Sequence, residues 1–268
     1  MINTYTGGAD NACGALGVGA LNTGDTLCSI GTSGVILSAE TNLKPEKGLH
    51  FFYHSKPNTL YKMGVTLAAG HSLSWFKNSF APKATYEELL ENISSIPAGS
   101  GGLLFTPYIS GERTPNADST IRGSFIGIDS KHKISNFSRA VLEGVTFSLR
   151  ECLELMNSSG RVSRVISIGG GSKNRDWMQM QADIFQTEII KLENDHGPAI
   201  GAAIIAAMGT QWFNTFEACC KQFIREEDTF EPIDSNVRVY EQLFKVYQDI
   251  YHATKDLNSR LKKYRNFG

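Results

Sequence analysis

GGADNACGALGVGA, residues 7–20, joins two glycines and one carboxylate to a run of small residues. No charged side chain follows from Asn11 to Ala20, so a helix formed here can lie close against its neighbours. Asp10 therefore stands where a buried helix begins, and a carboxylate at that point often caps the first turn. A general base is the alternative role. The stretch alone leaves both roles open.

The composition narrows the class of protein. The 268 residues are 41% hydrophobic, which allows one large domain with a real core. The 26 Lys and Arg nearly balance the 27 Asp and Glu, so the net charge of -1 argues against nucleic acid as a partner. Five cysteines without C-x-x-C spacing argue against a disulfide framework or a zinc site and favour a reducing compartment.

Membrane insertion and export are not expected. The longest apolar run, residues 199–208, is about half of what a bilayer span requires. The N-terminus has no basic-then-apolar signal pattern. The sequence therefore predicts a cytoplasmic protein with no membrane partner.

Strand and helix patterns alternate along the chain and predict an α/β fold with a mixed sheet. Extended runs on either side of the turn at residues 31–34 predict a β-hairpin. Helical spacing of apolar residues predicts a long core-facing helix over 135–156, which Gly160 would stop. Further strands are expected at 51–53, 60–65, 103–105, 123–128, 165–168 and 188–192, and further helices at 68–76, 85–93, 176–185, 199–208 and 237–264.

Three glycine-rich turns follow or adjoin predicted strands: Gly7-Gly8, Gly31-Thr32-Ser33-Gly34 and Gly169-Gly170-Gly171. Backbone N–H groups in such turns bind anions, and the hydroxyls of Thr32 and Ser33 would add donors that suit phosphate. A nucleotide is the natural ligand to expect. No turn has the spacing G-x-x-x-x-G-K-S/T, and each alone is more often a tight turn than a phosphate site.

Other chemistry has little support in the sequence. The six histidines show no H-E-x-x-H pairing, so no metal ligand is predicted, and no serine lies in G-x-S-x-G, the usual hydrolase signature. The loop at 107–115 carries Glu112-Arg113, which could position a phosphate or form a local ion pair.

Taken in order, these pieces resemble the C-terminal half of a sugar kinase of the FGGY carbohydrate kinase family. Its C-terminal signature is matched at every specified position by Gly123-x-Phe125-x-Gly127-Ile128 and then Asn136-Phe137-x-x-Ala140-Val141-Leu142-Glu143. The stretches GGADN, GTSG, PYISGERTP and GGGSKN, which begin at residues 7, 31, 107 and 169, are similar to the xylulokinase branch in wording and order.

The resemblance implies an actin-like, ribonuclease H-like ATPase domain, with ATP as the phosphate donor and Mg²⁺ on the phosphates. It implies that Asp10 is the catalytic base, which takes the proton from the attacking sugar hydroxyl. No side chain is implied as a metal ligand. The positions that match nucleotide-binding residues of the family are Gly31, Thr32, Ser33, Gly70, Ser74, Gly170, Gly171 and Asn174.

Residues 1–268 would thus form the C-terminal, nucleotide-binding and catalytic domain of such a kinase. Nothing before Gly7 resembles the N-terminal, sugar-binding domain, which is therefore an expected partner, together with a nucleotide and a sugar. The expected reaction is phosphorylation of D-xylulose to D-xylulose 5-phosphate, with gluconate as another sugar to consider. The isolated chain is expected to bind nucleotide without phosphorylating sugar, and a homodimer is a further expectation.

Two other classes stay open on the sequence alone. One is a nucleotide-binding or dimerisation module without catalysis, and the other is a dinucleotide-dependent oxidoreductase, which the glycine content suggests. The kinase interpretation requires the three glycine-rich turns to gather around one polyphosphate, with Asp10 directed at its terminal phosphate.

Overall fold

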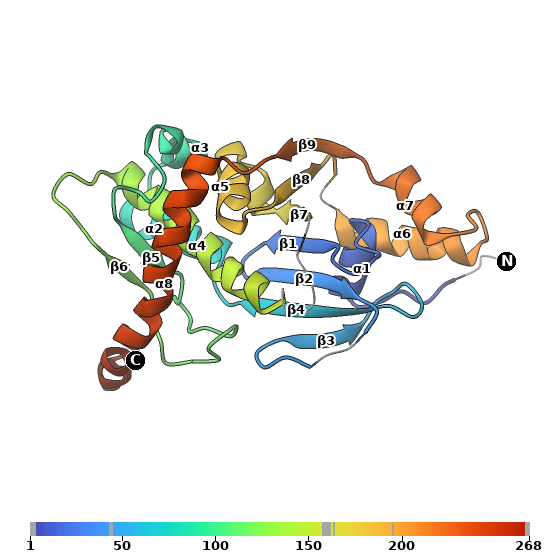
Figure 1. Cartoon of the computed structure of the whole chain (residues 1–268), viewed down its shortest axis with the longest axis horizontal. Helices are drawn as coiled ribbons and strands as arrows, with labels where there is room; N and C mark the ends of the chain where they lie inside the picture. Colours follow the sequence, from blue (N-terminus) through green and yellow to red (C-terminus); the bar gives the residue numbers. More distant parts are fainter. Residues whose placement is uncertain (1–3, 43–44, 157–161, 163, 195, 266–268) are drawn as a thin grey trace.

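The computed structural model describes residues 4–42, 45–156, 162, 164–194 and 196–265. Its centre is a seven-stranded sheet in the order β3-β4-β2-β1-β7-β8-β9 (Figure 1). The strands are β1 (Thr26–Ile30), β2 (Gly34–Glu40), β3 (His50–Tyr53), β4 (Leu60–Thr66), β7 (Arg164–Gly169), β8 (Glu188–Leu192) and β9 (Glu226–Phe230). A separate pair is formed by β5 (Leu104–Thr106) and β6 (Ser124–Ile126).

The sheet is mixed, as the sequence predicted. Strand β1 pairs antiparallel with β2 and parallel with β7, and β7 pairs parallel with β8. The antiparallel strands β4, β3 and β9 complete its two sides. Because β1 and β7 are parallel neighbours, their carboxyl ends, at Ile30 and Gly169, lie at the same edge of the sheet.

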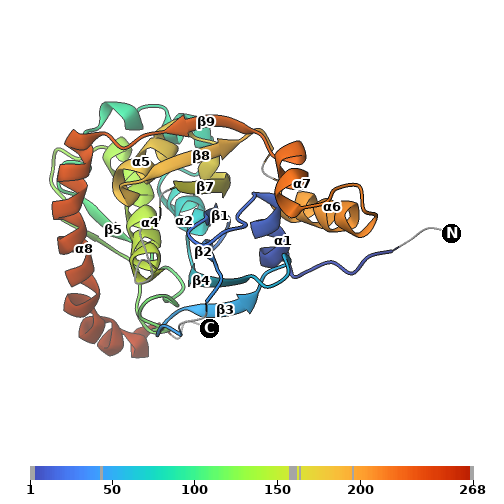
Figure 2. The same cartoon turned by 45° about the vertical axis from the view of Figure 1, so that its right-hand side comes forward.

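Helices cover both faces of this sheet (Figure 2). Their bounds are α1 (Asp10–Gly17), α2 (Gly70–Phe80), α3 (Tyr86–Leu90), α4 (Ile134–Met156), α5 (Arg175–Phe185), α6 (Gly197–Gly209), α7 (Phe216–Phe223) and α8 (Asp234–Leu261). On one face Ala12 and Ala15 of α1 pack on Leu27 and Leu37. The larger core, on the other face, belongs mainly to α2, α4, α5 and α8.

Alternate residues of β1 point into the two hydrophobic cores, one on each face of the sheet. Leu27 lies in the cluster beneath α1, whereas Cys28 and Ile30 lie in the cluster that includes Val141 of α4. A strand with apolar residues on both faces must be covered on both, and β1 and β7 occupy the middle of the sheet. This fixes the layer order as helix, sheet, helix.

The expected long helix is confirmed as α4 (Ile134–Met156), whereas Gly160, its predicted stop, lies outside the described residues. The capping prediction for Asp10 is wrong. Ala9 occupies the N-cap, and Asp10 is the first helical residue, where its carboxylate accepts a hydrogen bond from the Asn11 N–H at 2.8 Å. The Asp10 side chain therefore does not cap the first turn.

Helices α1 and α6 approach until their backbones touch. A Cβ atom added at Gly17 would overlap the carbonyl oxygen of Gly197, and one added at Gly201 would overlap that of Cys13. By contrast, a Cβ at Gly14 would meet Pro198 Cγ at 3.8 Å, an ordinary contact. The run of small residues at 7–20 thus permits a close helix pair, as its composition predicted.

Gly201→Ala is expected to lower the free energy of unfolding by about 1–3 kcal/mol, because the new methyl group forces the two backbones apart. Gly14→Ala is the matched control, since it adds the same methyl group to the same helix pair without a clash. That control should be neutral or stabilising by up to about 1 kcal/mol, the helix propensity gain of Ala over Gly. Urea unfolding of both variants measures the difference, and equal stability of the two would contradict the packing argument.

Candidate functional site

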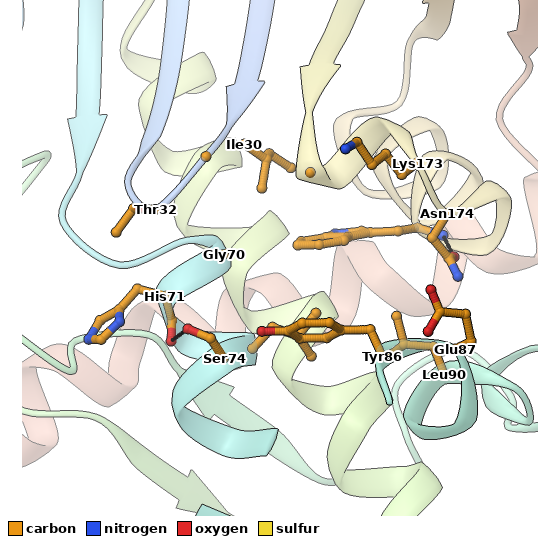
Figure 3. Close-up of a pocket in the computed structure, with 14 residues that line it drawn as sticks. Ile30, Thr32, Gly70, His71, Ser74, Tyr86, Glu87, Leu90, Lys173 and Asn174 are labelled. Carbon is orange, nitrogen blue, oxygen red and sulfur yellow. Dashed lines mark hydrogen bonds between the residues drawn. The ribbon is translucent and has the colours of Figure 1, made fainter. Parts of the chain in front are cut away.

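A pocket of about 510 Å³ opens where β1 and β7 end (Figure 3). Crevices at the carboxyl ends of parallel strands are the usual ligand sites of α/β sheets. Helices α2, α3 and α5 form its other walls. The lining residues are Ile30, Gly31, Thr32, Gly70, His71, Leu73, Ser74, Tyr86, Glu87, Leu90, Gly170, Lys173, Asn174 and Trp177.

The tip of the β1–β2 hairpin is bound to the start of α2. The Gly70 N–H donates to the Gly31 carbonyl at 2.8 Å, and the Thr32 carbonyl accepts from the N–H groups of Ala69 and His71 at 3.0 and 3.1 Å. A Cβ at Gly70 would lie 2.5 Å from the Gly31 oxygen, so only glycine fits there without a shift. The hairpin and α2 therefore form one wall of fixed geometry.

The second turn packs against the end of β1. Gly169 has φ +82°, and a Cβ there would lie 2.7 Å from the Ile30 carbonyl oxygen. A Cβ on Gly171 would lie 2.6 Å from Ile30 Cδ1. Gly170, between them, lines the pocket. The three glycines thus let β7 turn sharply beside β1 and expose the backbone of Gly170.

Helix α5 begins at the same pocket. The Asn174 side-chain oxygen accepts a hydrogen bond from the Trp177 N–H at 2.9 Å, which makes Asn174 the N-cap. Helix N-termini carry a partial positive charge and favour anions, and both α2 and α5 start at pocket residues. The pocket is therefore suited to a ligand that carries negative charge.

One part of the pocket is apolar. Leu73 and Trp177 belong to the main core, and Leu90 of α3 is also buried there. The Trp177 indole is fixed because its Nε1–H donates to Thr146 Oγ1 at 3.0 Å. Apolar and aromatic walls beside a few polar groups are typical of sites that bind a flat heterocycle.

Six of the expected nucleotide residues line this pocket: Gly31, Thr32, Gly70, Ser74, Gly170 and Asn174. The Ser74 hydroxyl donates to the His71 carbonyl at 3.0 Å, so it is engaged within its own helix. Gly171 and Ser33 are not lining residues: Gly171 packs on Ile30, and Ser33 is exposed at the hairpin tip.

The Gly7-Gly8 turn and Asp10 lie apart from the pocket. Gly7 and Gly8 line a separate hollow of about 320 Å³ that also includes Tyr61 and His54. Asp10 is exposed, and its charge adds to the effect of burial in raising the pKa of Tyr61. The expectation that all three turns line one cavity is therefore wrong for the first turn.

The first turn lies apart from the pocket because the two are on opposite faces of the sheet. Helix α1 packs on the face that carries Leu27 and Leu37, whereas Leu73 and Trp177 of the pocket belong to the core on the other face. A linear sequence does not show which face a helix will cover. Within the described residues, two turns share one pocket and the third contributes to another.

Sequence reasoning missed the pocket residues of α3, Tyr86 and Glu87, and also Lys173 and His71. The predicted cap at Thr85 and the acidic first turn located α3 correctly, but nothing local indicated that this helix faces α5. Only the folded chain brings the two helices to one cavity.

Glu112 turns inward and away from this pocket. It is 3% exposed and accepts hydrogen bonds from Ser148 Oγ at 3.2 Å and from the N–H groups of Leu67 and Arg113 at 3.3 and 2.7 Å. Burial raises the pKa of Glu112 to about 7. Its contacts assign Glu112 to anchoring the 107–115 loop on α4, while the Arg113 side chain is exposed.

Two properties of the described residues bear on other functions. They contain no group of three or more His, Cys, Asp or Glu side chains that could hold a metal ion. None of their helices combines the length and apolar character of a membrane span. All five cysteines are buried free thiols.

Comparison with known proteins gives a consistent result. Residues 26–210 match the C-terminal domain of the FGGY family of carbohydrate kinases. A xylulose kinase of Bacillus subtilis is 58% identical over 97% of this chain and 53% of its own length. A xylulose kinase of Lactococcus lactis is 48% identical over 100% of this chain and 54% of its own. The chain spans about half the length of the curated relatives it matches.

Solved structures have the same architecture. The crystal structure of a xylulose kinase from Brucella ovis matches with a TM-score of 0.85 and 33% identity over 92% of this chain and 52% of that one. A ligand-bound xylulose kinase from Lactobacillus acidophilus gives a TM-score of 0.87 over 93% of this chain and 51% of that one; at 24% identity it supports the fold alone.

Proposed function

The chain belongs to the FGGY family of carbohydrate kinases, whose C-terminal domain it contains, and on this basis we propose that it is the nucleotide-binding half of a kinase that phosphorylates D-xylulose. The N-terminal half of such a kinase would supply most of the sugar contacts. The observation that carries the proposal is the meeting of two glycine-rich turns, at Gly31-Thr32 and Gly170, at the starts of two helices.

The geometry supports ATP as the phosphate donor. The exposed backbone at Gly31 and Gly170, the hydroxyl of Thr32 and the positive end of α2 suit a polyphosphate. The apolar wall formed by Leu73, Leu90 and Trp177 suits the base. Charged and apolar parts thus lie within one pocket of a size ordinary for such ligands.

Asp10 is the proposed general base. It is exposed at the start of α1 and lies outside the nucleotide pocket, so the proposal requires a second domain to bring the sugar hydroxyl and the terminal phosphate to its carboxylate. Phosphoryl transfer passes through a loose transition state, so positioning of the two substrates and neutralisation of charge contribute most of the catalysis. The backbone groups of the pocket would orient the phosphates while Asp10 holds the proton.

The donor set also fits Mg²⁺. This ion keeps several waters and takes few protein ligands when substrate phosphates bind it, so it needs no cage of side chains. The described residues offer no such cage. An ion carried by the nucleotide would supply neutralisation of the phosphate charge.

The names of the relatives support the choice of sugar. Five relatives at 46–58% identity are xylulose kinases, whereas a Bacillus subtilis gluconokinase is 29% identical. We propose a cytoplasmic location because free buried thiols suit a reducing compartment. A homodimer stays a prediction.

Calorimetric titration of this chain with Mg·ATP tests the nucleotide site. Thr32→Val is expected to weaken binding about tenfold, because it removes a hydroxyl donor to a charged phosphate and keeps the shape of the side chain. Ser33→Ala removes the adjacent hydroxyl, which does not line the pocket, and should leave binding unchanged. A wild-type chain that ignores millimolar ATP, or equal losses in both variants, would reject the proposed site.

A further inference from the structure

Two adjacent glutamates of α3 have different surroundings. Glu88 is engaged in a capping box: its Oε2 accepts from the Thr85 N–H at 2.8 Å, and Thr85 Oγ1 accepts from the Glu88 N–H at 3.2 Å. Glu87 lines the pocket instead, and among the described residues no group donates a hydrogen bond to its side chain. Glu87 is thus an acceptor available to a ligand.

Asn174 supplies the matching donor. Its Oδ1 is occupied by the Trp177 N–H, so the Nδ2 amide group is the part of the side chain left for a ligand. Figure 3 shows the Glu87 carboxylate directed toward the Asn174 amide, with Thr32 and Gly70 at the other end of the pocket. One acceptor and one donor therefore face each other at the end remote from the phosphate-binding turns.

Charge fixes the direction in which a nucleotide would enter. A carboxylate repels phosphate, whereas the backbone of Gly31 and the N-terminus of α2 attract it. The phosphates therefore belong at the Thr32 end and the base at the Glu87 end. Leu73, Leu90 and Trp177 also line the pocket, and their apolar surfaces suit the faces of a purine.

We propose that Glu87 is the residue that makes this pocket prefer adenine, with its carboxylate accepting a hydrogen bond from the N6 amino group while Asn174 Nδ2 donates to the adjacent ring nitrogen. This proposal rests on the proposed nucleotide site and goes beyond it, because it names the residue that recognises the base. A guanine in the same orientation presents O6, an acceptor, to the carboxylate. Two acceptors that face each other repel, so the Glu87 carboxylate would disfavour guanine as well as favour adenine.

The contact between Glu87 and the N6 amino group is tested by a double-mutant cycle in which one change is made in the protein and the other in the ligand. Mg·ADP is compared with the Mg complex of purine riboside diphosphate, which has hydrogen in place of the N6 amino group, by titration calorimetry on the 268-residue chain. Glu87→Ala should weaken ADP binding about tenfold, the usual effect of losing a hydrogen bond to a charged group. The same variant should leave binding of the analogue nearly unchanged.

Three further measurements strengthen the design. Glu87→Gln keeps a carbonyl acceptor and should recover part of the lost ADP affinity. Glu91→Ala removes an exposed carboxylate at the C-cap of the same helix, outside the pocket, and should have no effect on either ligand. GDP should bind the wild-type chain more weakly than ADP, and Glu87→Ala should narrow that gap.

The outcomes separate the two proposals. If Glu87→Ala weakens ADP and the analogue equally, the contact is to the ribose and the assignment to the base is overturned. If Glu87→Ala changes the affinity for neither ligand, Glu87 does not contact the nucleotide and the proposal is overturned. If the folded wild-type chain, checked by its cooperative thermal transition, binds no purine nucleotide at all, the nucleotide site itself is wrong.

Discussion

Glu143→Ala is expected to lower the free energy of unfolding by about 3–5 kcal/mol, the typical cost of removing one partner from a buried ion pair. Glu143 is 1% exposed, and its carboxylate is surrounded by donors. It accepts from the Gly99 N–H at 3.0 Å, and from Ser100 Oγ, Arg139 Nε and Tyr240 Oη at 2.8 Å each. One side chain thus joins the 99–100 turn, α4 and α8.

The expected loss of stability is large because Glu143→Ala leaves the buried Arg139 side chain without its ion-pair partner. Arg139, whose side chain is 8% exposed, would keep its positive charge with no anion beside it, although it still donates to the Ile93 carbonyl. Tyr240→Phe is the graded control: it removes the two hydrogen bonds of the hydroxyl, one donated to Glu143 and one accepted from Arg139 Nη2 at 2.9 Å, and keeps the ion pair, so a smaller loss of about 1–3 kcal/mol is expected. Urea unfolding followed by circular dichroism measures both. A Glu143→Ala variant within about 1 kcal/mol of wild type would contradict the structural role assigned to this network.

Asp10→Asn is expected to reduce sugar phosphorylation by about 10²–10⁴-fold, the usual contribution of a general base. The fold should survive, because the side chain is exposed and its recorded contact is with the Asn11 N–H, which an amide oxygen can also accept. ADP binding should be unchanged as well, since Asp10 does not line the nucleotide pocket. The change therefore separates catalysis from binding and stability.

The measurement uses a two-domain protein that joins this chain to the N-terminal half of a xylulose kinase relative, assayed by release of ADP with D-xylulose. Asp129→Asn, an exposed carboxylate in a turn outside the pocket, controls for the loss of one surface charge. A variant at Asp10 with turnover within tenfold of the parent would favour the alternative of a nucleotide-binding module without catalysis.

Much of the fold could be predicted because its signals are local. The hairpin at Gly31-Thr32-Ser33-Gly34 and the helix over Ile134–Met156 follow from turn residues and helical spacing. Strand β9 (Glu226–Phe230) and helix α7 (Phe216–Phe223) were not predicted. In β9 the first two residues are exposed glutamates, so no apolar alternation marks it as a strand.

The candidate site was harder to predict because it depends on which elements meet. The turns at Gly31 and Gly170 could be predicted as candidate ligand-binding turns, and both line one pocket because β1 pairs parallel with β7. Glu87 has the same sequence signal as Glu88, an acidic residue in a first helical turn. Their different roles follow from the direction each side chain takes, which depends on the position of α3 relative to α5. Glu112 is a similar case: its burial and its hydrogen bonds to Ser148 of α4 and to backbone N–H groups gave it an anchoring role that the sequence did not predict.

The contact between α1 and α6 has a mechanical consequence. With the Gly201 and Cys13 backbones touching, no layer of side chains lies at that crossing to absorb sliding, so we expect the two helices to move as one rigid body. Asp10 begins one of them, and its position is therefore set in part by residues nearly two hundred positions later in the chain. Any closure of a second domain onto this one would have to carry the whole helix pair with it. The base that we propose at Asp10 would therefore be positioned by the α1–α6 pair beneath it and not by its own loop.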